Sequence, residues 1–183
     1  MNIVYGCATL RAIEEKDFDL LFEMINSPEI ESTSGGWNFP ISSHEQRRWM
    51  TEFKNSNSCL RLMIELENGY TIGMTGLNNI DWKNRVAEIN YKISPSLTGR
   101  IRGDMFDACM GLLRYAFLEM GMNRIEGFTY TDNVFSLKLV RKLGFKEEGI
   151  LRKRVYKNGQ FCDQVAVALL RDEFIDEKGI NLK

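Results

Sequence analysis

The sequence is poor in the residues that thiol and metal chemistry require. Its 183 residues include four cysteines and one histidine. No two of the cysteines form a CxxC pair, and together with the histidine they give neither the ligand spacing of a metal site nor a Cys-His nucleophile pair. These residues are Cys7, Cys59, Cys109, Cys162 and His44. We therefore expect a reduced, cytoplasmic protein without a bound metal.

The chain also lacks an excess of either charge, long apolar runs and linker-like segments. Its 24 basic and 25 acidic residues leave a formal charge of -1, which gives no global field to attract nucleic acid or an anionic membrane. We find no apolar run of membrane-spanning length, no signal peptide and no Pro/Gly/Ser-rich linker. We therefore expect residues 1–183 to form a single domain that binds neither nucleic acid nor a membrane.

What is present is a regular succession of strand-like and helix-like segments. The apolar spacing predicts helices over 15–30, 42–53, 103–120 and 134–144, the first ended by a Ser-Pro pair and the second opened by a Ser-x-x-Glu capping box. Strands are predicted over 8–13, 59–66, 70–80, 85–93, 123–130, 145–156 and 161–170. This order predicts an α/β (α+β) fold, a mixed and mostly antiparallel seven-stranded sheet with helices on both faces.

A glycine-containing turn, Arg100 to Met105, stands between a strand and a strongly apolar helix. Free amides at a helix N-terminus attract phosphate groups, and glycines allow such groups to approach closely. The same residues are also suited to start a helix without a ligand, and Asp104 there would complement the helix dipole in either case. The turn by itself leaves both interpretations open.

Three segments, "AEINYKI", "RIRGDM" and "NVFSLKLVRKLGF", resemble the GNAT superfamily of acetyl-CoA-dependent N-acetyltransferases. The resemblance extends over about residues 8–174 and is greatest to the branch of ribosomal-protein N-terminal acetyltransferases. It implies an acyltransferase that moves an acetyl group from acetyl-CoA to a primary amine on a peptide N-terminus, a polyamine or an amino sugar. It also implies that the central strands of the sheet splay apart.

The resemblance further implies which residues contact the cofactor. Arg100 and Gly103 match the Q/R-x-x-G-x-G/A pattern, whereas Met105 departs from it by placing a long side chain where the diphosphate should approach. Asn133 matches the residue that holds the pantetheine region, although it is equally suited to cap a helix. The implied cofactor-binding residues are Tyr91, Lys92, Ile93, Arg100, Ile101, Arg102, Gly103, Asp104, Met105 and Asn133.

The acceptor amine must lose its proton before it attacks, so a general base is expected. Glu88, Asn90 and Lys92 alternate along one predicted strand and share a face. The resemblance implies that Glu88 acts as the base through water. An ion pair of Glu88 with Lys92 or Arg85 is the alternative interpretation.

The leaving thiolate of CoA must be protonated or stabilised. Many family members use a tyrosine, but Val140 stands at the matching position here. Ser136 matches a serine that the ribosomal branch uses on the thiolate side, although a serine at a helix start can instead bond to its own backbone. We therefore predict Glu88 and Ser136 as the catalytic residues.

The acceptor side is less defined by the sequence. Trp37 and Phe39, beside a Gly-Gly pair, and Asn90 are predicted to contact the acceptor, while core packing is the alternative for Trp37. A GNAT-like module that binds CoA without efficient catalysis remains the second functional hypothesis. We expect a monomer or a homodimer.

Overall fold

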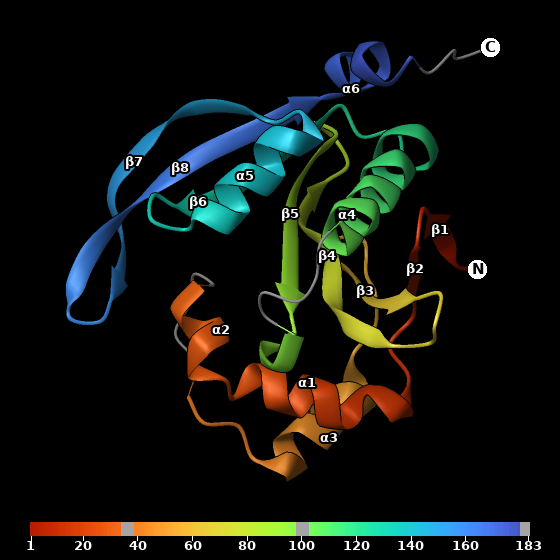
Figure 1. Cartoon of the computed structure of the whole chain (residues 1–183), viewed down its shortest axis with the longest axis vertical. Helices are drawn as coiled ribbons and strands as arrows, with labels where there is room; N and C mark the ends of the chain where they lie inside the picture. The colour runs from red at the N-terminus through yellow and green to blue at the C-terminus, as the bar shows by residue number, and fades with distance from the viewer. Residues whose placement is uncertain (34–38, 98–102, 180–183) are drawn as a thin grey trace. The chain divides into compact units, whose positions relative to one another are not determined.

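The computed structural model describes residues 1–33, 39–97 and 103–179. The strands form an eight-stranded sheet in the order β1-β2-β3-β4-β5-β6-β8-β7 (Figure 1). Residue contacts divide the chain into two compact units, Met1–Gly76 with Tyr91–Leu112 and Leu77–Asn90 with Leu113–Lys183. Strands β4 and β5 each contribute residues to both units. That the whole chain is one domain stays a prediction.

The strands are β1 (Ile3–Tyr5), β2 (Ala8–Arg11), β3 (Leu60–Leu66), β4 (Thr71–Asp81), β5 (Val86–Ile93), β6 (Arg124–Tyr130), β7 (Lys146–Lys157) and β8 (Gln160–Leu170). The α-helices are α1 (Phe18–Ile25), α2 (Pro28–Thr33), α3 (Ser43–Glu52), α4 (Asp104–Arg114), α5 (Val134–Leu143) and α6 (Arg171–Lys178). Short 3-10 helices are η1 (Glu15–Asp17) and η2 (Pro95–Leu97), and a π-helical turn, η3 (Tyr115–Glu119), continues α4.

The predicted mixed, mostly antiparallel fold is confirmed, but the sheet has eight strands where seven were predicted. The additional strand is β1, which pairs with β2 in antiparallel register with Val4 opposite Thr9. Gly6 makes the tight connection with φ of 53°. Because β1 has only three residues, it is too short to show the alternating pattern by which strands are predicted.

The first predicted helix is divided by its proline. Helix α1 ends at Ile25, and Pro28 begins α2 rather than ending the helical region. Proline lacks the amide hydrogen that a helix interior needs but is well suited to the first turn of a new helix. Helix α6 was not predicted. Its packing depends strongly on Phe174, which is fully buried with its ring centroid 5.0 Å from that of Phe117.

The predicted start of α3 is confirmed at atomic detail. Ser42 Oγ accepts a hydrogen bond from the Glu45 amide at 3.2 Å, and Glu45 Oε2 accepts one from the Ser42 amide at 2.9 Å. Helix α3 packs beside α1, where the guanidinium of Arg47 lies 4.0 Å from the ring centroid of Phe18. The capping box therefore fixes where the chain enters this helix pair.

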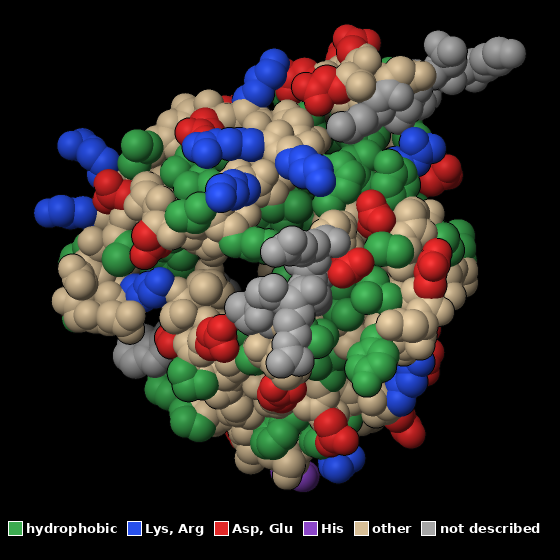
Figure 2. All heavy atoms as spheres, in the orientation of Figure 1, with side chains coloured by type: hydrophobic (Ala, Val, Ile, Leu, Met, Phe, Trp, Pro, Cys, Tyr) green, Lys and Arg blue, Asp and Glu red, His purple; other side chains and the backbone are tan. Residues whose placement is uncertain are grey.

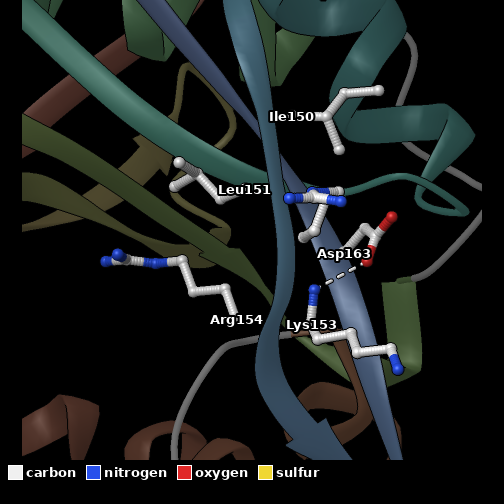
Figure 3. Close-up of a pocket in the computed structure, with 6 residues that line it drawn as sticks. Ile150, Leu151, Lys153, Arg154 and Asp163 are labelled. Atoms are coloured by element: carbon white, nitrogen blue, oxygen red, sulfur yellow. Dashed lines mark hydrogen bonds between the residues drawn. The ribbon is translucent and has the colours of Figure 1, made fainter.

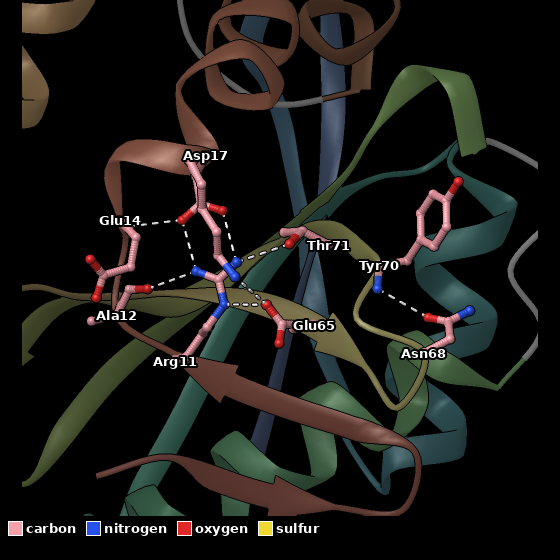
Figure 4. A network of polar contacts seen from close by, with 9 residues as sticks. Arg11, Ala12, Glu14, Asp17, Glu65, Asn68, Tyr70 and Thr71 are labelled. Atoms are coloured by element: carbon pink, nitrogen blue, oxygen red, sulfur yellow. Dashed lines mark hydrogen bonds and ion pairs between the residues drawn. The ribbon is translucent and has the colours of Figure 1, made fainter.

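A buried arginine connects four elements of the first unit (Figure 4). Arg11 on β2 binds Asp17 of η1 through two nitrogen–oxygen contacts of 2.8 Å, and its Nε lies 2.6 Å from Glu65 Oε2 on β3. Its Nη2 also donates to Thr71 Oγ1 on β4 at 2.9 Å. Arg11 is 8% exposed and Asp17 is 2% exposed, so the pair satisfies both charges away from water.

The second unit contains the predicted closing hairpin. Strands β7 and β8 run side by side as a long antiparallel ribbon (Figure 1), and β8 pairs along the whole of β6. Helix α5 ends at Gly144, whose φ of 99° is the left-handed conformation of a helix C-cap. The predictions for this part of the chain are confirmed.

The helix predicted over 103–120 is confirmed as α4 and η3. The apolar stripe is buried with zero exposure at Cys109, Leu112, Leu113, Ala116 and Phe117. The helix ends where Gly121 takes a φ of 67°. The stripe therefore supplies core contacts, which explains its strength in the sequence.

Basic and acidic side chains are interspersed on the face shown in Figure 2, as a formal charge of -1 suggests. In the described part of the chain, no helix is both long enough and apolar enough to cross a membrane.

Candidate active site

The start of α4 is the part of the predicted cofactor turn that the structure describes; Arg100, Ile101 and Arg102 lie outside the described residues. Gly103 has a φ of 93°, and a Cβ atom built there would meet no atom of the described, non-adjacent residues within 4 Å. The Met105 side chain is 2% exposed and belongs to the core. The place of Met105 in the motif suggests that its side chain projects in front of the helix. Its burial shows that the side chain turns into the core instead.

Asp104, which places a negative charge directly after Gly103, is held by a residue far away in the sequence. The Cys7 thiol lies 3.2 Å from Asp104 Oδ1 and 3.2 Å from Asp107 Oδ2, and the Cys7 amide donates to Asp107 Oδ2 at 3.1 Å. Burial, together with these two carboxylates, raises the pKa of Cys7 to about 12. The β1–β2 turn is thus bonded to the first turn of α4 by a thiol that keeps its proton at neutral pH.

The end of β5 is where the resemblance places the pantetheine contacts. The parallel pairing of β5 with β6 ends at Glu88 opposite Glu126, although β5 continues to Ile93 and β6 to Tyr130. That the central strands splay apart stays a prediction. Tyr91, Lys92 and Ile93 are half-buried.

Lys92 is an unusual member of this strand. Burial lowers the pKa of its ammonium group, and the nearby Arg61 lowers it further. The Arg61 guanidinium lies 5.4 Å from the ring centroid of Phe53 and 5.8 Å from that of Trp49. Among residues 1–33, 39–97 and 103–179, no carboxylate forms an ion pair with Lys92 or Arg61. The first unit therefore holds two neighbouring cations that no described anion neutralises.

Glu88, the predicted base, is half-exposed on β5. Its Oε2 accepts a hydrogen bond from Asn79 Nδ2 at 3.0 Å. Within the described residues it forms no ion pair with Lys92 or with Arg85, whose Nη1 instead points to the Met120 carbonyl at 3.4 Å. The alternative interpretation of Glu88 as a structural ion-pair partner therefore receives no support.

The start of α5 carries the other predicted polar residues of the second unit. Asn133 Oδ1 accepts a hydrogen bond from the Ser136 amide at 3.0 Å, so Asn133 is the helix cap. Ser136 is 7% exposed, and Val140, at the tyrosine position of the family, is 3% exposed. Cap and cofactor roles are compatible for Asn133, because the cap uses only its Oδ1 atom.

The predicted acceptor residues are less well defined. Trp37 lies outside the described residues, Phe39 is 67% exposed, and Asn90 is half-buried on β5. The described residues bring no group of three or more His, Cys, Asp or Glu side chains together in a way that could hold a metal ion.

A hollow of about 750 Å³ lies on the β7–β8 hairpin, and none of the predicted site residues lines it (Figure 3). It is formed by a bulge in which Lys153 has a φ of 51° and its amide donates to Asp163 Oδ1 at 2.7 Å. Leu151 and Arg154 project to one side of β7 and Ile150 to the other. The Arg154 guanidinium lies 4.7 Å from the Phe128 ring centroid, so it is already engaged.

The residues that the sequence did not reveal are Cys7, Asp107 and Asn79. Each acts through a partner on another element: Cys7 with the start of α4, and Asn79 on β4 with Glu88 on β5. No spacing or motif marks such partners, because the contacts depend on how strands and helices pack. Only the helix-start position of Asp104 and Asp107 could have been read from the sequence.

Comparison with known proteins agrees with this architecture. A family model described as acetyltransferase (GNAT) domain matches residues 8–146. The Bacillus subtilis (strain 168) protein named "Putative ribosomal N-acetyltransferase YdaF" is 33% identical over 179 residues, covering 93% of this chain and 94% of that protein. A spermidine N(1)-acetyltransferase of Vibrio cholerae is 24% identical and covers 92% of this chain and 95% of its own length.

A solved structure shows the same fold. The crystal structure of spermidine N-acetyltransferase from Vibrio cholerae in complex with CoA and spermine matches with a TM-score of 0.82 at 25% identity, covering 92% of this chain and 98% of that chain.

Proposed function

Because this chain belongs to the GNAT acetyltransferase family and is an N-acetyltransferase that uses acetyl-CoA, we propose that Glu88 is its general base and Ser136 its general acid. The observation that carries the proposal is the exposure and bonding of the Glu88 carboxylate. It is half-exposed, oriented by Asn79 and engaged in no ion pair with a described residue. A carboxylate in this condition is able to accept a proton from the acceptor amine or from an intervening water.

Acetyl-CoA supplies an acetyl thioester that the neutral amine attacks, so that an amide bond forms and CoA leaves as the thiol. The Asn79 hydrogen bond occupies Glu88 Oε2, while Oε1 receives no hydrogen bond from a described residue. We assign proton acceptance to this carboxylate. Ser136, at the start of α5, gives a proton to the leaving sulfur and takes one back from water.

We propose that the cofactor phosphates lie at the turn that opens α4. Support comes from Gly103, where a Cβ would meet nothing within 4 Å, and from the burial of Met105. Neither places a side chain next to the N-terminal amides of α4, which attract anions. The proposed diphosphate turn is completed by Arg100, Ile101 and Arg102. The pantetheine arm is contacted by the chain from Tyr91 to Ile93 and by the side-chain amide nitrogen of Asn133.

The acceptor is an amine, and we propose that it also carries a negative charge. Support comes from Lys92 and Arg61, neighbouring cations that no described carboxylate pairs with. Such a pair attracts a carboxylate or phosphate and repels a polyamine. An acidic peptide or a phosphorylated amino sugar therefore fits better than spermidine, although relatives named for spermidine share the fold.

The test measures CoA thiol release with acetyl-CoA and four acceptors: a peptide with an acidic second residue, its basic counterpart, a phosphorylated amino sugar and spermidine. Glu88→Gln keeps an acceptor for Asn79 but cannot take a proton, and should lower kcat by about 10²-fold with an unchanged KM for acetyl-CoA. Ser136→Ala should also lower kcat while retaining cofactor binding. Glu126→Gln is the matched control, because Glu126 stands opposite Glu88 in register but is paired with Arg124.

The outcomes separate the assignments. Full activity in Glu88→Gln or Ser136→Ala contradicts the role given to that residue. Lys92→Met should reduce the preference for the acidic peptide over the basic one. The acceptor proposal is contradicted if this preference is unchanged in Lys92→Met. It is also contradicted if the wild type prefers spermidine. Cofactor binding without thiol release from any amine would instead indicate a binding module.

A further inference from the structure

Asp104 poses an electrostatic problem for the proposed cofactor site. It is the first residue of α4, directly after Gly103, where the diphosphate of acetyl-CoA is proposed to bind. A carboxylate in a first helical turn is favourable for the helix dipole but repels an anion bound in front of the same turn. The site therefore requires that the Asp104 side chain be kept from turning toward the ligand.

The contacts of Cys7 meet this requirement. Its thiol lies 3.2 Å from Asp104 Oδ1 and 3.2 Å from Asp107 Oδ2, so that one proton serves both carboxylates. The donors come from the β1–β2 turn, where Gly6 packs so tightly that a Cβ would lie 2.2 Å from Asp107 Oδ2. The thiol thus stands on a turn that lies directly against the first two turns of α4.

We propose that Cys7 is a positioning residue for acetyl-CoA: its thiol hydrogen bond holds the Asp104 carboxylate against the β1–β2 turn, away from the diphosphate in front of α4. The inference rests on the proposed diphosphate site. The raised pKa of Cys7 supports it, since the thiol remains a donor throughout the neutral range. The separate bond from the Cys7 amide to Asp107 Oδ2, at 3.1 Å, does not involve the side chain. A side-chain substitution therefore leaves the turn attached to the helix.

The experiment compares KM values for acetyl-CoA and for S-acetyl-pantetheine, which lacks the diphosphate. Cys7→Ala releases Asp104 and should raise KM for acetyl-CoA by about fivefold, as expected for the loss of one weak donor to a charged group. Its KM for S-acetyl-pantetheine and its kcat should be the same as in the wild type. Cys7→Ser, which retains a donor, should restore most of the affinity.

A second pair of variants separates positioning from a structural role. Asp104→Asn removes the repelling charge and should lower KM for acetyl-CoA, and the double variant Cys7→Ala/Asp104→Asn should behave as Asp104→Asn alone. Cys162→Ala, which removes another half-buried free cysteine, is the matched control. The melting temperature of each variant is measured to confirm that it is folded.

An unchanged KM for acetyl-CoA in Cys7→Ala overturns the inference. The inference is also overturned if KM rises equally for acetyl-CoA and for S-acetyl-pantetheine in Cys7→Ala, or if adding Asp104→Asn does not suppress the rise. Either result indicates a general disturbance of the helix. Failure of the underlying cofactor assignment gives a different result. In that case Gly103→Glu would leave KM for acetyl-CoA unaltered.

Discussion

The residue Asp104 shows that a side chain's role can depend on one distant contact. It occupies a helix start, where an acidic residue is favourable by itself, and it also borders the proposed diphosphate site. Its carboxylate is bonded to the thiol of Cys7, 97 residues earlier in the sequence. Met105 is a similar case, since its long side chain turns into the core. In both cases a contact with a distant segment, rather than the position in the motif, determines where the side chain lies.

The charged residue Glu65 allows a prediction of how stability depends on pH. Hydrogen bonds from Lys16 and Arg11 hold its pKa below the usual glutamate value. As pH falls, the unfolded chain therefore takes up this proton before the folded chain does. The stabilisation is complete above the usual glutamate pKa and is lost as pH falls through the lowered folded value.

Glu65→Gln should consequently be less stable than the wild type at pH 7 and should lose stability less steeply as the solution is acidified. Urea unfolding at a series of pH values measures both effects. Glu67→Gln is the control, because Glu67 is exposed on the turn that follows β3. Parallel acid profiles for Glu65→Gln and the wild type would contradict the prediction.

At the scale of elements, helix α5 combines a cap with a proposed cofactor contact. Asn133 caps the helix through Oδ1, and its amide nitrogen is proposed to face the pantetheine arm. Asn133→Ala should lower the free energy of unfolding by about 1 kcal/mol, because the cap is lost. Asn133→Asp keeps the capping oxygen but loses the amide donor.

These two substitutions separate the roles of Asn133. Asn133→Asp should retain the stability of the wild type and raise KM for acetyl-CoA, while Asn133→Ala should change both quantities. Urea unfolding gives the stabilities, and thiol release gives KM. A normal KM in Asn133→Asp would leave the cap as the only role of this residue.

The pairing of β5 with β6 is also a property of elements rather than of residues. Three residue pairs are in register, from Val86 opposite Arg124 to Glu88 opposite Glu126, and then the pairing ends. Past that point β6 continues to pair with β8 as far as Tyr130. That β5 pairs with the extended arm of the cofactor beyond Glu88 stays a prediction of the family resemblance.

At the scale of the whole molecule, ligand binding should appear as a gain in stability. Acetyl-CoA at a hundred times its dissociation constant should stabilise the folded protein by about 2.7 kcal/mol. For a chain of this size the gain corresponds to a rise in melting temperature of about 5–10 °C. Gly103→Glu should abolish this rise, because it adds a negative charge where the diphosphate is proposed to bind.

Gly103→Ala is the matched control for this thermal-shift experiment. It introduces the same backbone strain at a φ of 93° without the charge, and a Cβ meets no atom within 4 Å. It should therefore have a lowered melting temperature in the absence of ligand but a preserved rise with acetyl-CoA. Equal rises in wild type and Gly103→Glu would contradict the placement of the diphosphate.

Most of the fold could be predicted, because its longer elements carry strong local signals. The stripe from Cys109 to Phe117, the Ser42–Glu45 capping box and the hairpin of β7 and β8 are examples. Strand β1 and helix α6 were not predicted, because three residues or a single aromatic anchor give too little periodicity. The candidate site was predicted only at the positions that the family motifs mark.

The sequence by itself determined the order of the longer elements, the family, and the polar face of β5 that carries Glu88. These features depend on spacing within short segments, which side-chain chemistry and helix or strand geometry fix locally. Only the tertiary structure decided that Glu88 is oriented by Asn79, that Met105 is buried, and that Cys7 holds Asp104. Those outcomes depend on packing between segments far apart in the chain, where burial and a few short contacts select one partner among many possible ones.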